Sequence, residues 1–492
     1  MTMPNRRTAL RLMAMTGAAL TLPVPTSASA AASTPASASA AAASGDPFTR
    51  PLPIPQVLQP IARTASYDLY RMHMRPADIE VLPGLLTRFQ TFEGQLPGPT
   101  IRARRGRTVV VEQINGLTMH TAVHLHGGHV SHDNDGYPLD VLMPGDSRRY
   151  VYHNRQQAAT LWYHDHAHMA EAENVYRGLA GVYILEDEHE RSLPLPAGRH
   201  DIPLALRDAK IEADGTLTYD GLPFHPTIMV NGASQPYLRV EARRYRFRIL
   251  NIANSRIFNL ALSTGDEFVQ IASDGGLLRA PNPIQSLQLY PAERAEVVVD
   301  FSRYPVGSHV ILHNTPNFLP GEPSEILRFD VVRSADADHS AVPQQLLPAD
   351  ASPEFDAQRP ACAKPVQRDF VLSFDMATGM MLINGKSFDP NRVDIRPVLG
   401  APEIWTVTNG DTKLPIPHTF HVHQAQFHVL DRDGKPPAPG EAGRKDTIAL
   451  APGETVRILI RFTEYTGRYV YHCHMLEHSA MGMMGQMELI RP

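Results

Sequence analysis

The sequence predicts an all-β protein made of several sandwich domains. From about Arg63 onward, short runs of β-branched and aromatic residues alternate with turns that contain proline or glycine, as in "TIRARRGRTVVVEQIN" and "YRFRILNIAN". Long stretches with the helical spacing of apolar residues are hard to find. At 492 residues the chain is also too long for a single hydrophobic core, so we expect domains of about 100 to 200 residues each.

A threefold repeat sets the number of domains. Three segments share a proline, a small residue and an acidic residue ahead of a strand-like run: "PGDSRRYVYHN" from Pro144, "PAERAEVVVDF" from Pro291 and "PGETVRILIRF" from Pro452. Such self-similarity predicts three related domains. We place these domains at residues 46–187, 188–345 and 368–492, with a proline- and alanine-rich linker over 346–367.

The segment 1–45 has the layout of an export signal followed by a tail. Arg6 and Arg7 precede a short apolar run, and small residues follow at Ala28-Ser29-Ala30. The adjacent arginines resemble a twin-arginine signal, and the rest of the segment is rich in alanine and serine. We therefore expect recognition by the twin-arginine export machinery and a periplasmic or secreted location. An ordinary secretory signal with two chance arginines is the alternative.

Charge and hydropathy exclude two classes of partner. The net charge is −5 and the basic residues are dispersed, so we expect no nucleic-acid partner. After the signal no stretch is long and apolar enough to cross a bilayer, so we expect no membrane insertion once the signal is removed.

The chain has only two cysteines, Cys362 and Cys473, although exported domains often use disulfides. A bridge between them stays open in principle. Cys362 lies in the proline-rich "RPACAKP", where we expect a buried or linker thiol, whereas Cys473 lies between histidines.

Paired histidines mark the first and third repeats. Each of these repeats carries two H-x-H pairs about 40 to 50 residues apart: His124/His126 and His164/His166, then His421/His423 and His472/His474. Side chains alternate along a strand, so the two histidines of a pair face the same way. One pair alone would fit ordinary surface or core histidines. Four pairs in equivalent repeats predict a nitrogen-rich cage for copper, zinc or iron.

Cys473 faces away from its two histidine neighbours, so one tripeptide can bind metals on both sides of its strand. On the cysteine side the sequence offers His418, His478 and Met483 as partners. Two imidazoles, a thiolate and a long thioether contact form the ligand set of a blue-copper electron-transfer site. An electron reaching Cys473 would then pass to the histidine cage through a few covalent bonds.

Four motifs resemble the copper-binding motifs of the multicopper oxidases, in the same order: "HLHGG…NDGYP", "WYHDH", "HTFHVH" and "HCHMLEHSAMGMM". The resemblance runs from about Pro51 to the C-terminus and is strongest to the three-domain bacterial laccases and bilirubin oxidases, which are related to spore-coat laccases. It implies three tandem cupredoxin-like Greek-key β-sandwich domains and four copper ions, one of type 1, one of type 2 and two of type 3. Dioxygen would be the oxidant.

The resemblance also implies a role for each ligand. The type 1 copper would be bound by His418, Cys473 and His478 with Met483 axial, and the type 2 copper by His124 and His421. The two type 3 ions would be bound by His126, His164 and His474, and by His166, His423 and His472. An axial methionine implies a low- to medium-potential enzyme. The reductant would be oxidised near His478, and its electrons would leave through Cys473.

Proton delivery is less clear from the sequence. Asp135 in "NDGYP" matches the family acid near the type 2 copper; the alternative is that it only forms the turn before Gly136. Ser479 departs from the pattern, since relatives commonly have an acid directly after the type 1 histidine. Glu477 is no automatic replacement, so a second proton route stays open.

The sequence therefore predicts a laccase-like oxidase that acts on phenols, aromatic amines or similar small aromatic reductants. The alternative is a cuprous-ion oxidase, which a set of methionines suggests: Met376, Met380, Met381, Met475, Met481, Met484 and Met487. Methionine is also a common core filler, no long methionine-rich insertion precedes the third domain, and "NGDTKLPIP" lacks an acid immediately before His418. A non-catalytic structural or cell-division protein is a weaker alternative, because all ten ligand histidines and Cys473 are present.

Overall fold

The computed structural model describes residues 46–315, 318–319, 322–348 and 364–492. It is nearly all-β, with 49% strand and 7% helix, which confirms the predicted fold class. The export segment, Cys362 and most of the predicted linker lie outside the described residues. Within the described part of the chain, no helix is both long and apolar enough to cross a membrane.

The first domain is a sandwich of two sheets. One sheet has the order β1-β2-β5-β7, with β3 paired to β2: β1 (Ala62–Arg63), β2 (Tyr67–Leu82), β3 (Leu85–Phe92), β5 (Thr108–Asn115) and β7 (Ser147–Tyr152). The other has the order β4-β9-β8-β6: β4 (Gly98–Arg104), β9 (Ala180–Glu186), β8 (Ala159–Asp165) and β6 (Val123–His126).

The second domain is also a sandwich of two sheets, and its sheets contain more strands than those of the first domain. One sheet has the order β11-β10-β14-β19-β16-β17, with β12 paired to β10: β10 (Asp201–Ile211), β11 (Leu217–Thr218), β12 (Thr227–Val230), β14 (Arg244–Asn251), β16 (Phe268–Ser273), β17 (Gly276–Ile284) and β19 (Arg294–Asp300). The facing sheet has the order β13-β21-β20-β15-β18: β13 (Tyr237–Ala242), β15 (Phe258–Leu262), β18 (Leu287–Leu289), β20 (His309–Asn314) and β21 (Glu325–Ser334).

The third domain is also a sandwich of two sheets. Its larger sheet has the order β23-β22-β24-β29-β26-β27: β22 (Val366–Asp375), β23 (Met380–Ile383), β24 (Pro402–Asn409), β26 (Phe427–Arg432), β27 (Arg444–Lys445) and β29 (Thr455–Arg461). Its smaller sheet has the order β28-β25-β30-β31: β25 (His418–Val422), β28 (Thr447–Leu450), β30 (Gly467–His472) and β31 (Met484–Leu489).

The repeated sequence segments occupy equivalent strands. In each domain two strands pair in parallel, β2 with β5, β10 with β14 and β22 with β24. A third strand then pairs antiparallel with the second of them, and this strand is β7, β19 or β29. These three strands are the ones that follow Pro144, Pro291 and Pro452. The repeat therefore reflects a shared topology, while the domain boundaries given above stay a prediction.

Helices are short and lie at the edges of the sandwiches. Those within the described residues are α2 (Glu171–Tyr176), α3 (Glu188–Ser192), α4 (Leu476–Ala480) and the 3-10 turns η1 (His132–Asn134), η2 (Gly198–His200), η3 (Phe301–Arg303) and η5 (Pro439–Glu441). Helix α2 of the first domain packs against α4 of the third through Ala172, Val175 and Leu476.

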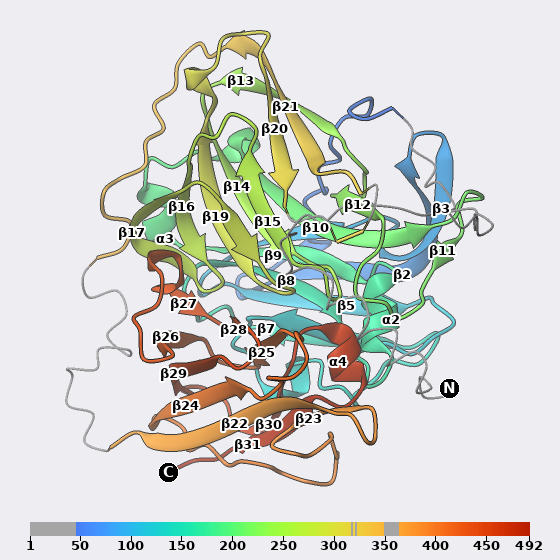
Figure 1. Ribbon diagram of the computed structural model, residues 1–492, viewed down its shortest axis with the longest axis vertical. Coiled ribbons are helices and arrows are strands. Elements are labelled where there is room, and N and C mark those ends of the chain that lie inside the picture. Colours follow the sequence, from blue (N-terminus) through green and yellow to red (C-terminus); the bar gives the residue numbers. More distant parts are fainter. Residues whose placement is uncertain (1–45, 316–317, 320–321, 349–363) are drawn as a thin grey trace, which may run out of the picture.

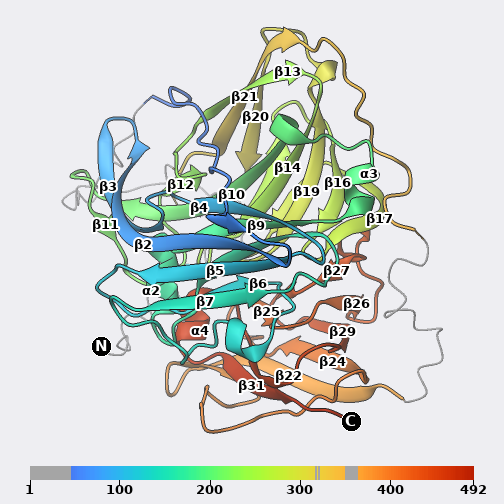
Figure 2. The same ribbon diagram turned by 180° about the vertical axis from the view of Figure 1, so that it is seen from behind.

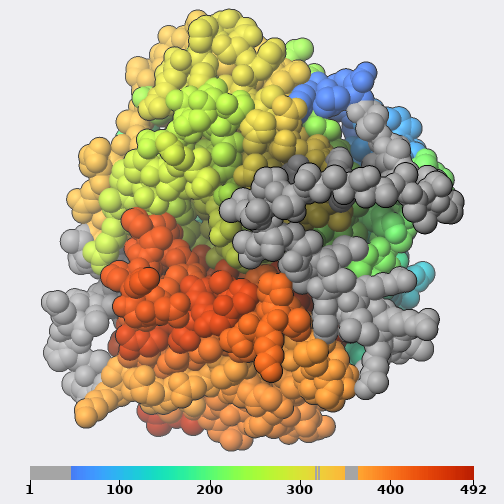
Figure 3. Space-filling model, in the orientation of Figure 1, coloured from blue at the N-terminus to red at the C-terminus, as the bar shows by residue number. Residues whose placement is uncertain are grey.

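The smaller sheet of the first domain contacts both the second and the third domain. Figure 1 shows the second domain (yellow-green) at the top and the third (orange to red) below, and Figure 2 shows β6 close to β25 from behind. Figure 3 shows the second and third domains meeting across the front face. Strand β8 is buried along its whole length, because Leu161 and Tyr163 enter the first-domain core while Trp162 packs against Ala205 and Leu250 of the second domain.

Candidate metal centres

Strand pairing brings eight histidines together between the first and third domains. In the first domain β6 pairs with β8, which places His124 opposite His164. In the third domain β25 pairs with β30, which places His421 opposite His472. The remaining four follow directly on these strands or belong to them, and all eight are at most 1% exposed: His124, His126, His164, His166, His421, His423, His472 and His474.

The imidazoles form groups whose nitrogens face one another. Three sets have one ring nitrogen from each member within 4.8 Å of the others: His126/His164/His474, His166/His423/His472 and His124/His126/His421. The shortest Nε2–Nε2 distances are 3.1 Å from His166 to His472, 3.3 Å from His423 to His472 and 3.4 Å from His164 to His474. With metal–imidazole bonds of about 2.0–2.1 Å, as for zinc, these spacings suit ligands that share an ion.

Hydrogen bonds fix which nitrogen carries the lone pair. The Nδ1 atom of His472 donates to the Cys473 carbonyl (2.9 Å), and Nδ1 of His423 donates to the Asp135 carboxylate (2.7 Å). A neutral imidazole has one N–H, so both Nε2 atoms are acceptors. Two lone pairs facing each other across 3.3 Å in a buried space repel, and a shared cation turns this repulsion into binding.

Three more lone pairs point into the same space. His124 and His421 donate through Nδ1 to the carbonyls of Asp135 (2.6 Å) and Asp446 (2.8 Å), respectively. His126 has the opposite orientation, because its Nε2 donates to the Asp446 carboxylate (3.0 Å). Among the described residues, the free nitrogens of these three rings are buried without a hydrogen-bond partner. Such orphaned acceptors are what a metal site requires.

Burial keeps the cage neutral. It lowers the pKa of most of these imidazoles well below the ordinary value, and neighbouring histidines lower it further: His126, His164, His166, His421, His423 and His474. Burial also lowers the pKa of His472 to about 3. These seven rings are therefore unprotonated near neutral pH and can bind a transition metal.

A second group lies on the other side of β30. Cys473 is fully buried, and its Sγ lies 3.6 Å from Nδ1 of His478 and 3.9 Å from Nδ1 of His418. Burial alone would raise the pKa of the thiol, but the two histidines outweigh burial and lower it to about 5. The group therefore offers a thiolate and two Nδ1 atoms, which are 3.2 Å apart. The backbone of Met483 bonds to Cys473 and His478, which brings this methionine beside the group.

His418 is oriented by an acid that the sequence analysis missed. Its Nε2 donates to the Asp411 carboxylate (2.8 Å), which leaves Nδ1 free to face Cys473. Asp411 lies seven residues upstream of His418 and not immediately before it, where an acid would have been recognised in the sequence. The turn between the two residues brings the Asp411 carboxylate to the His418 ring, and no local pattern in the sequence predicts this contact.

Asp135 is more than a turn residue. It is fully buried and touches two ligand candidates, His423 through its carboxylate and His124 through its carbonyl. The next residue, Gly136, has φ +72°, and a Cβ there would lie 2.2 Å from the Val123 carbonyl. The turn therefore requires glycine and holds the acid against β6.

Ser479 contacts a buried acid from another domain, which sequence reasoning also missed. Its hydroxyl donates to Glu171 at the start of α2 (3.1 Å). Burial raises the pKa of this carboxyl to about 8. Glu477 accepts hydrogen bonds from Asn254 (2.7 Å) and Ser255 (2.5 Å), so it anchors α4 to the second domain.

Comparison with known proteins agrees with this geometry. Residues 73–190, 206–330 and 357–490 each match a multicopper oxidase family model. The chain is 35% identical to a laccase from Bacillus subtilis (strain 168), covering 90% of this chain and 99% of the relative.

Solved structures of similar proteins have the same cupredoxin-like fold. A laccase from Pediococcus acidilactici superposes with a TM-score of 0.81 at 32% identity, covering 91% of this chain and 95% of the other. A multicopper oxidase from Campylobacter jejuni, described as a metallo-oxidase, superposes with a TM-score of 0.77 at 26% identity over 91% and 96% of the two chains. The chain therefore belongs to the multicopper oxidase family and is a copper-dependent oxidoreductase that uses oxygen as its electron acceptor.

Proposed function

We propose that this protein is a laccase-type oxidase that couples one-electron oxidation of phenols, aromatic amines or similar small reductants to the four-electron reduction of dioxygen to water. The tripeptide His472–His474 carries the proposal, since its cysteine belongs to one ligand group and its histidines to the other. When bound, four copper ions would supply the redox chemistry: one accepts electrons from the reductant and three reduce dioxygen. The chain supplies a covalent path of a few bonds between them.

Each ion has a set of ligands in this proposal. His418, Cys473, His478 and Met483 would hold the type 1 ion, and His124 and His421 the type 2 ion. His126, His164 and His474 would hold one type 3 ion, and His166, His423 and His472 the other. The first and third domains contribute four histidines each to the trinuclear cluster. The orphaned nitrogens described above fit this assignment.

His478 is the ligand that faces the reductant. It is 6% exposed, whereas His418 and Cys473 are fully buried. It lies on α4, a short helix at the edge of the sandwich. An aromatic reductant that packs against this helix is therefore closest to the His478 ring.

Two buried acids serve proton delivery. Asp135 lies against His124 and His423, so it can hold a proton at the rim of the cluster. Glu171 provides a carboxyl beside Ser479, where the sequence lacks the acid that relatives have. Burial raises the pKa of Glu171 to about 8, so this carboxyl keeps a proton to donate near neutral pH.

Cuprous-ion oxidation is the second candidate, supported by the metallo-oxidase among the structural neighbours. Four of the seven methionines singled out above are buried core residues: Met381, Met475, Met484 and Met487. Met376 is 65% exposed. This distribution favours the packing role, and so the laccase-type function. Export by the twin-arginine route to the periplasm or the medium remains part of the proposal and rests on Arg6 and Arg7.

Oxygen uptake tests the proposal. The copper-loaded protein is given a phenolic dye precursor or cuprous ion, and the two rates are compared. We expect faster uptake with the phenol. We also expect Cys473→Ser to lose both the blue absorption and phenol oxidation, because it removes the thiolate of the type 1 site. A strong preference for cuprous ion would overturn the substrate class, and an equally blue, equally active Cys473→Ser protein would overturn the electron path.

A further inference from the structure

Arg294 belongs to the second domain, which contributes no proposed ligand, yet it contacts all three domains. It begins β19 and is buried. Its Nε donates to the Thr160 carbonyl on β8 of the first domain (3.0 Å). Within its own domain Nη1 donates to the Ala292 carbonyl (3.1 Å) and Nη2 to the Asp274 carbonyl (3.0 Å). The last two donors go to the Asp446 carboxylate of the third domain, both at 2.6 Å.

All five N–H donors of this guanidinium are therefore used. Arginine is the only side chain that can do this, because its fork is planar and rigid. A lysine has three donors on a flexible stem and would keep the charge without the geometry.

Asp446 connects this ion pair to two proposed copper ligands. Both carboxylate oxygens accept from Arg294, and one of them, Oδ1, also accepts from Nε2 of His126 (3.0 Å). The Asp446 carbonyl accepts from Nδ1 of His421 (2.8 Å). The two imidazoles come from different domains and stack with ring centroids 3.7 Å apart. Asp446 thus accepts from the N–H of both rings, and the Thr447 hydroxyl lies 3.2 Å from the same two nitrogens.

The backbone at Gly127 packs so closely against the Arg294–Asp446 ion pair that a larger side chain would not fit. Gly127 follows His126 with φ +79°, and a Cβ there would lie 2.6 Å from Asp446 Oδ2 and 2.9 Å from Arg294 Nη2. The strand that carries the histidine therefore lies directly on the Arg294–Asp446 pair.

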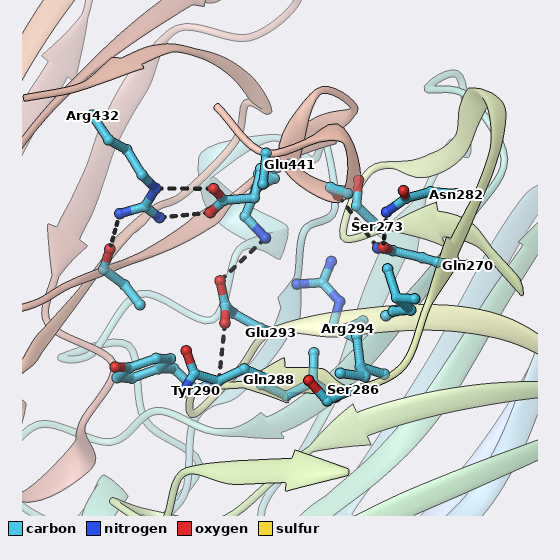
Figure 4. Close-up of a pocket in the computed structure, with 18 of the residues that line it drawn as sticks. Gln270, Ser273, Asn282, Ser286, Gln288, Tyr290, Glu293, Arg294, Arg432 and Glu441 are labelled. Carbon is cyan, nitrogen blue, oxygen red and sulfur yellow. Dashed lines mark hydrogen bonds and ion pairs between the residues drawn. The ribbon is translucent and has the colours of Figure 1, made fainter. Parts of the chain in front are cut away.

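The pair is backed by further charges at the boundary of the second and third domains. A cavity of about 420 Å³ lies there, with Glu293 and Arg294 on the second-domain side and Arg432 and Glu441 on the third-domain side (Figure 4). Lys445 bridges Asp274 (2.9 Å) and Glu293 (3.2 Å). Alternating charges thus lead from the cavity to Asp446 and hold Arg294 in place.

We propose that Arg294 is a positioning residue for the trinuclear copper cluster, acting through Asp446 on His126 and His421. This inference rests on the proposed function, since it assumes that these histidines bind copper. Groups that orient metal-binding histidines typically change metal affinity or activity by about 10- to 100-fold. The second domain would then serve the cluster without contributing a ligand.

Copper binding and spectroscopy of Arg294→Lys test the proposal. We expect cluster copper to bind about 10- to 100-fold more weakly, with a changed electron paramagnetic resonance spectrum of the type 2 ion. The blue band of the type 1 ion should be unchanged, because its ligands do not touch Arg294. Asp446→Asn should give the same pattern, and it serves as the readout if Arg294→Lys does not fold.

Arg256→Lys is the matched control. Arg256 is equally buried in the same domain, but its guanidinium contacts Asp208, Glu322 and the His225 carbonyl. We expect its cluster spectrum and copper affinity to match the wild type. Wild-type cluster properties in both Arg294→Lys and Asp446→Asn would overturn the inference. Failure of the wild-type protein to bind cluster copper would instead overturn the proposed function.

Discussion

Glu171 is a fully buried carboxyl for which no cation provides an ion pair among the described residues. The polar groups that interact with it come from three elements: Asp165 on β8, Ser479 on α4 and Tyr219 after β11. Burial is the main reason that its pKa rises, Asp165 raises it further, and the hydrogen bond from Ser479 opposes the rise. The net result is a pKa of about 8, against an ordinary value of 4.5.

Replacing Glu171 by glutamine should remove a proton that the folded protein holds more tightly than the unfolded chain. A raised pKa gives stability that is present in full below about pH 4.5 and is lost as the pH rises through about 8. Between these values the copper-free wild type should lose about 1.4 kcal/mol per pH unit more than Glu171→Gln. Denaturant unfolding at several pH values measures this difference.

Infrared spectroscopy provides a second readout for the same substitution. The wild type should show a protonated carboxyl component that disappears with a midpoint near pH 8, and Glu171→Gln should lack this component while keeping the one from Asp165, whose pKa burial raises to about 7. Glu173→Gln, on the same helix and paired with Arg177 at the surface, is the control and should keep both components. If Glu171→Gln kept both the component near pH 8 and the wild-type slope, Glu171 would not be the buried acid described here.

Sequence reasoning found the ligand candidates and Asp135, but not the other residues that orient the ligands. Cys473 and the H-x-H pairs are recognisable because their chemistry and their alternation along a strand are local properties. Asp446 lies 320 positions from His126, so only the folded chain reveals their contact. Arg294 and Glu171 were not predicted either, because their contacts with Asp446 and Ser479 also join distant parts of the sequence.

At the scale of secondary structure, the end of β6 shows how closely the ligand strand packs. Gly127 and Gly145 both have left-handed backbones, with φ +79° and +87°. A Cβ at Gly127 would meet Asp446 and Arg294, whereas a Cβ at Gly145 would meet nothing within 4 Å. The two positions therefore separate the cost of backbone strain from the cost of a steric clash.

Gly145→Ala should cost about 1–2 kcal/mol of unfolding free energy, which is the strain of a left-handed alanine. Gly127→Ala should cost more and should also lower the cluster copper content, because the new methyl group displaces the Asp446 carboxylate from His126. Unfolding midpoints and copper analysis of the two variants measure this. Equal effects of the two substitutions would show that the ion pair can yield without disturbing the ligands.

The sequence correctly predicted which segments form strands, but not the residue at which each strand ends. The repeats after Pro144, Pro291 and Pro452 correctly indicated three equivalent strands, because turn residues and apolar alternation are local signals. The H-x-H pairs were expected within strands, whereas His166, His423 and His474 lie just beyond β8, β25 and β30. All three residues still reach the cage.

At the scale of the whole molecule, both proposed type 3 sets draw ligands from the first and third domains. Bound copper would therefore hold these domains together. The type 1 set lies within the third domain alone. Loss of cluster copper and loss of type 1 copper should then have different effects on the assembly.

Removing copper with a chelator should lower the unfolding temperature and expose the boundary between the first and third domains to protease. A bound ion stabilises the folded state by about 2.7 kcal/mol when its free concentration is 100 times the Kd. Cys473→Ser, which lacks only the type 1 ion, should keep most of this stabilisation. If Cys473→Ser had the unfolding temperature and protease sensitivity of the chelated protein, the stabilisation by copper would arise within the third domain and not between domains.

The role of the second domain could not be predicted from its sequence. It lacks the histidine pairs, so the repeat comparison marks it only as copper-free. Its contributions, Arg294 toward Asp446 and Asn254 and Ser255 toward Glu477, depend on how three sandwiches pack together. Packing between domains is a long-range property that motif spacing does not encode.

The tripeptide His472–His474 also fixes how far an electron must tunnel. Both ligand groups are attached to the same few backbone atoms, so motion between domains would not change the separation of Cys473 from the histidines on either side of it. Raising solvent viscosity should therefore slow the encounter with a reductant while leaving internal electron transfer unchanged.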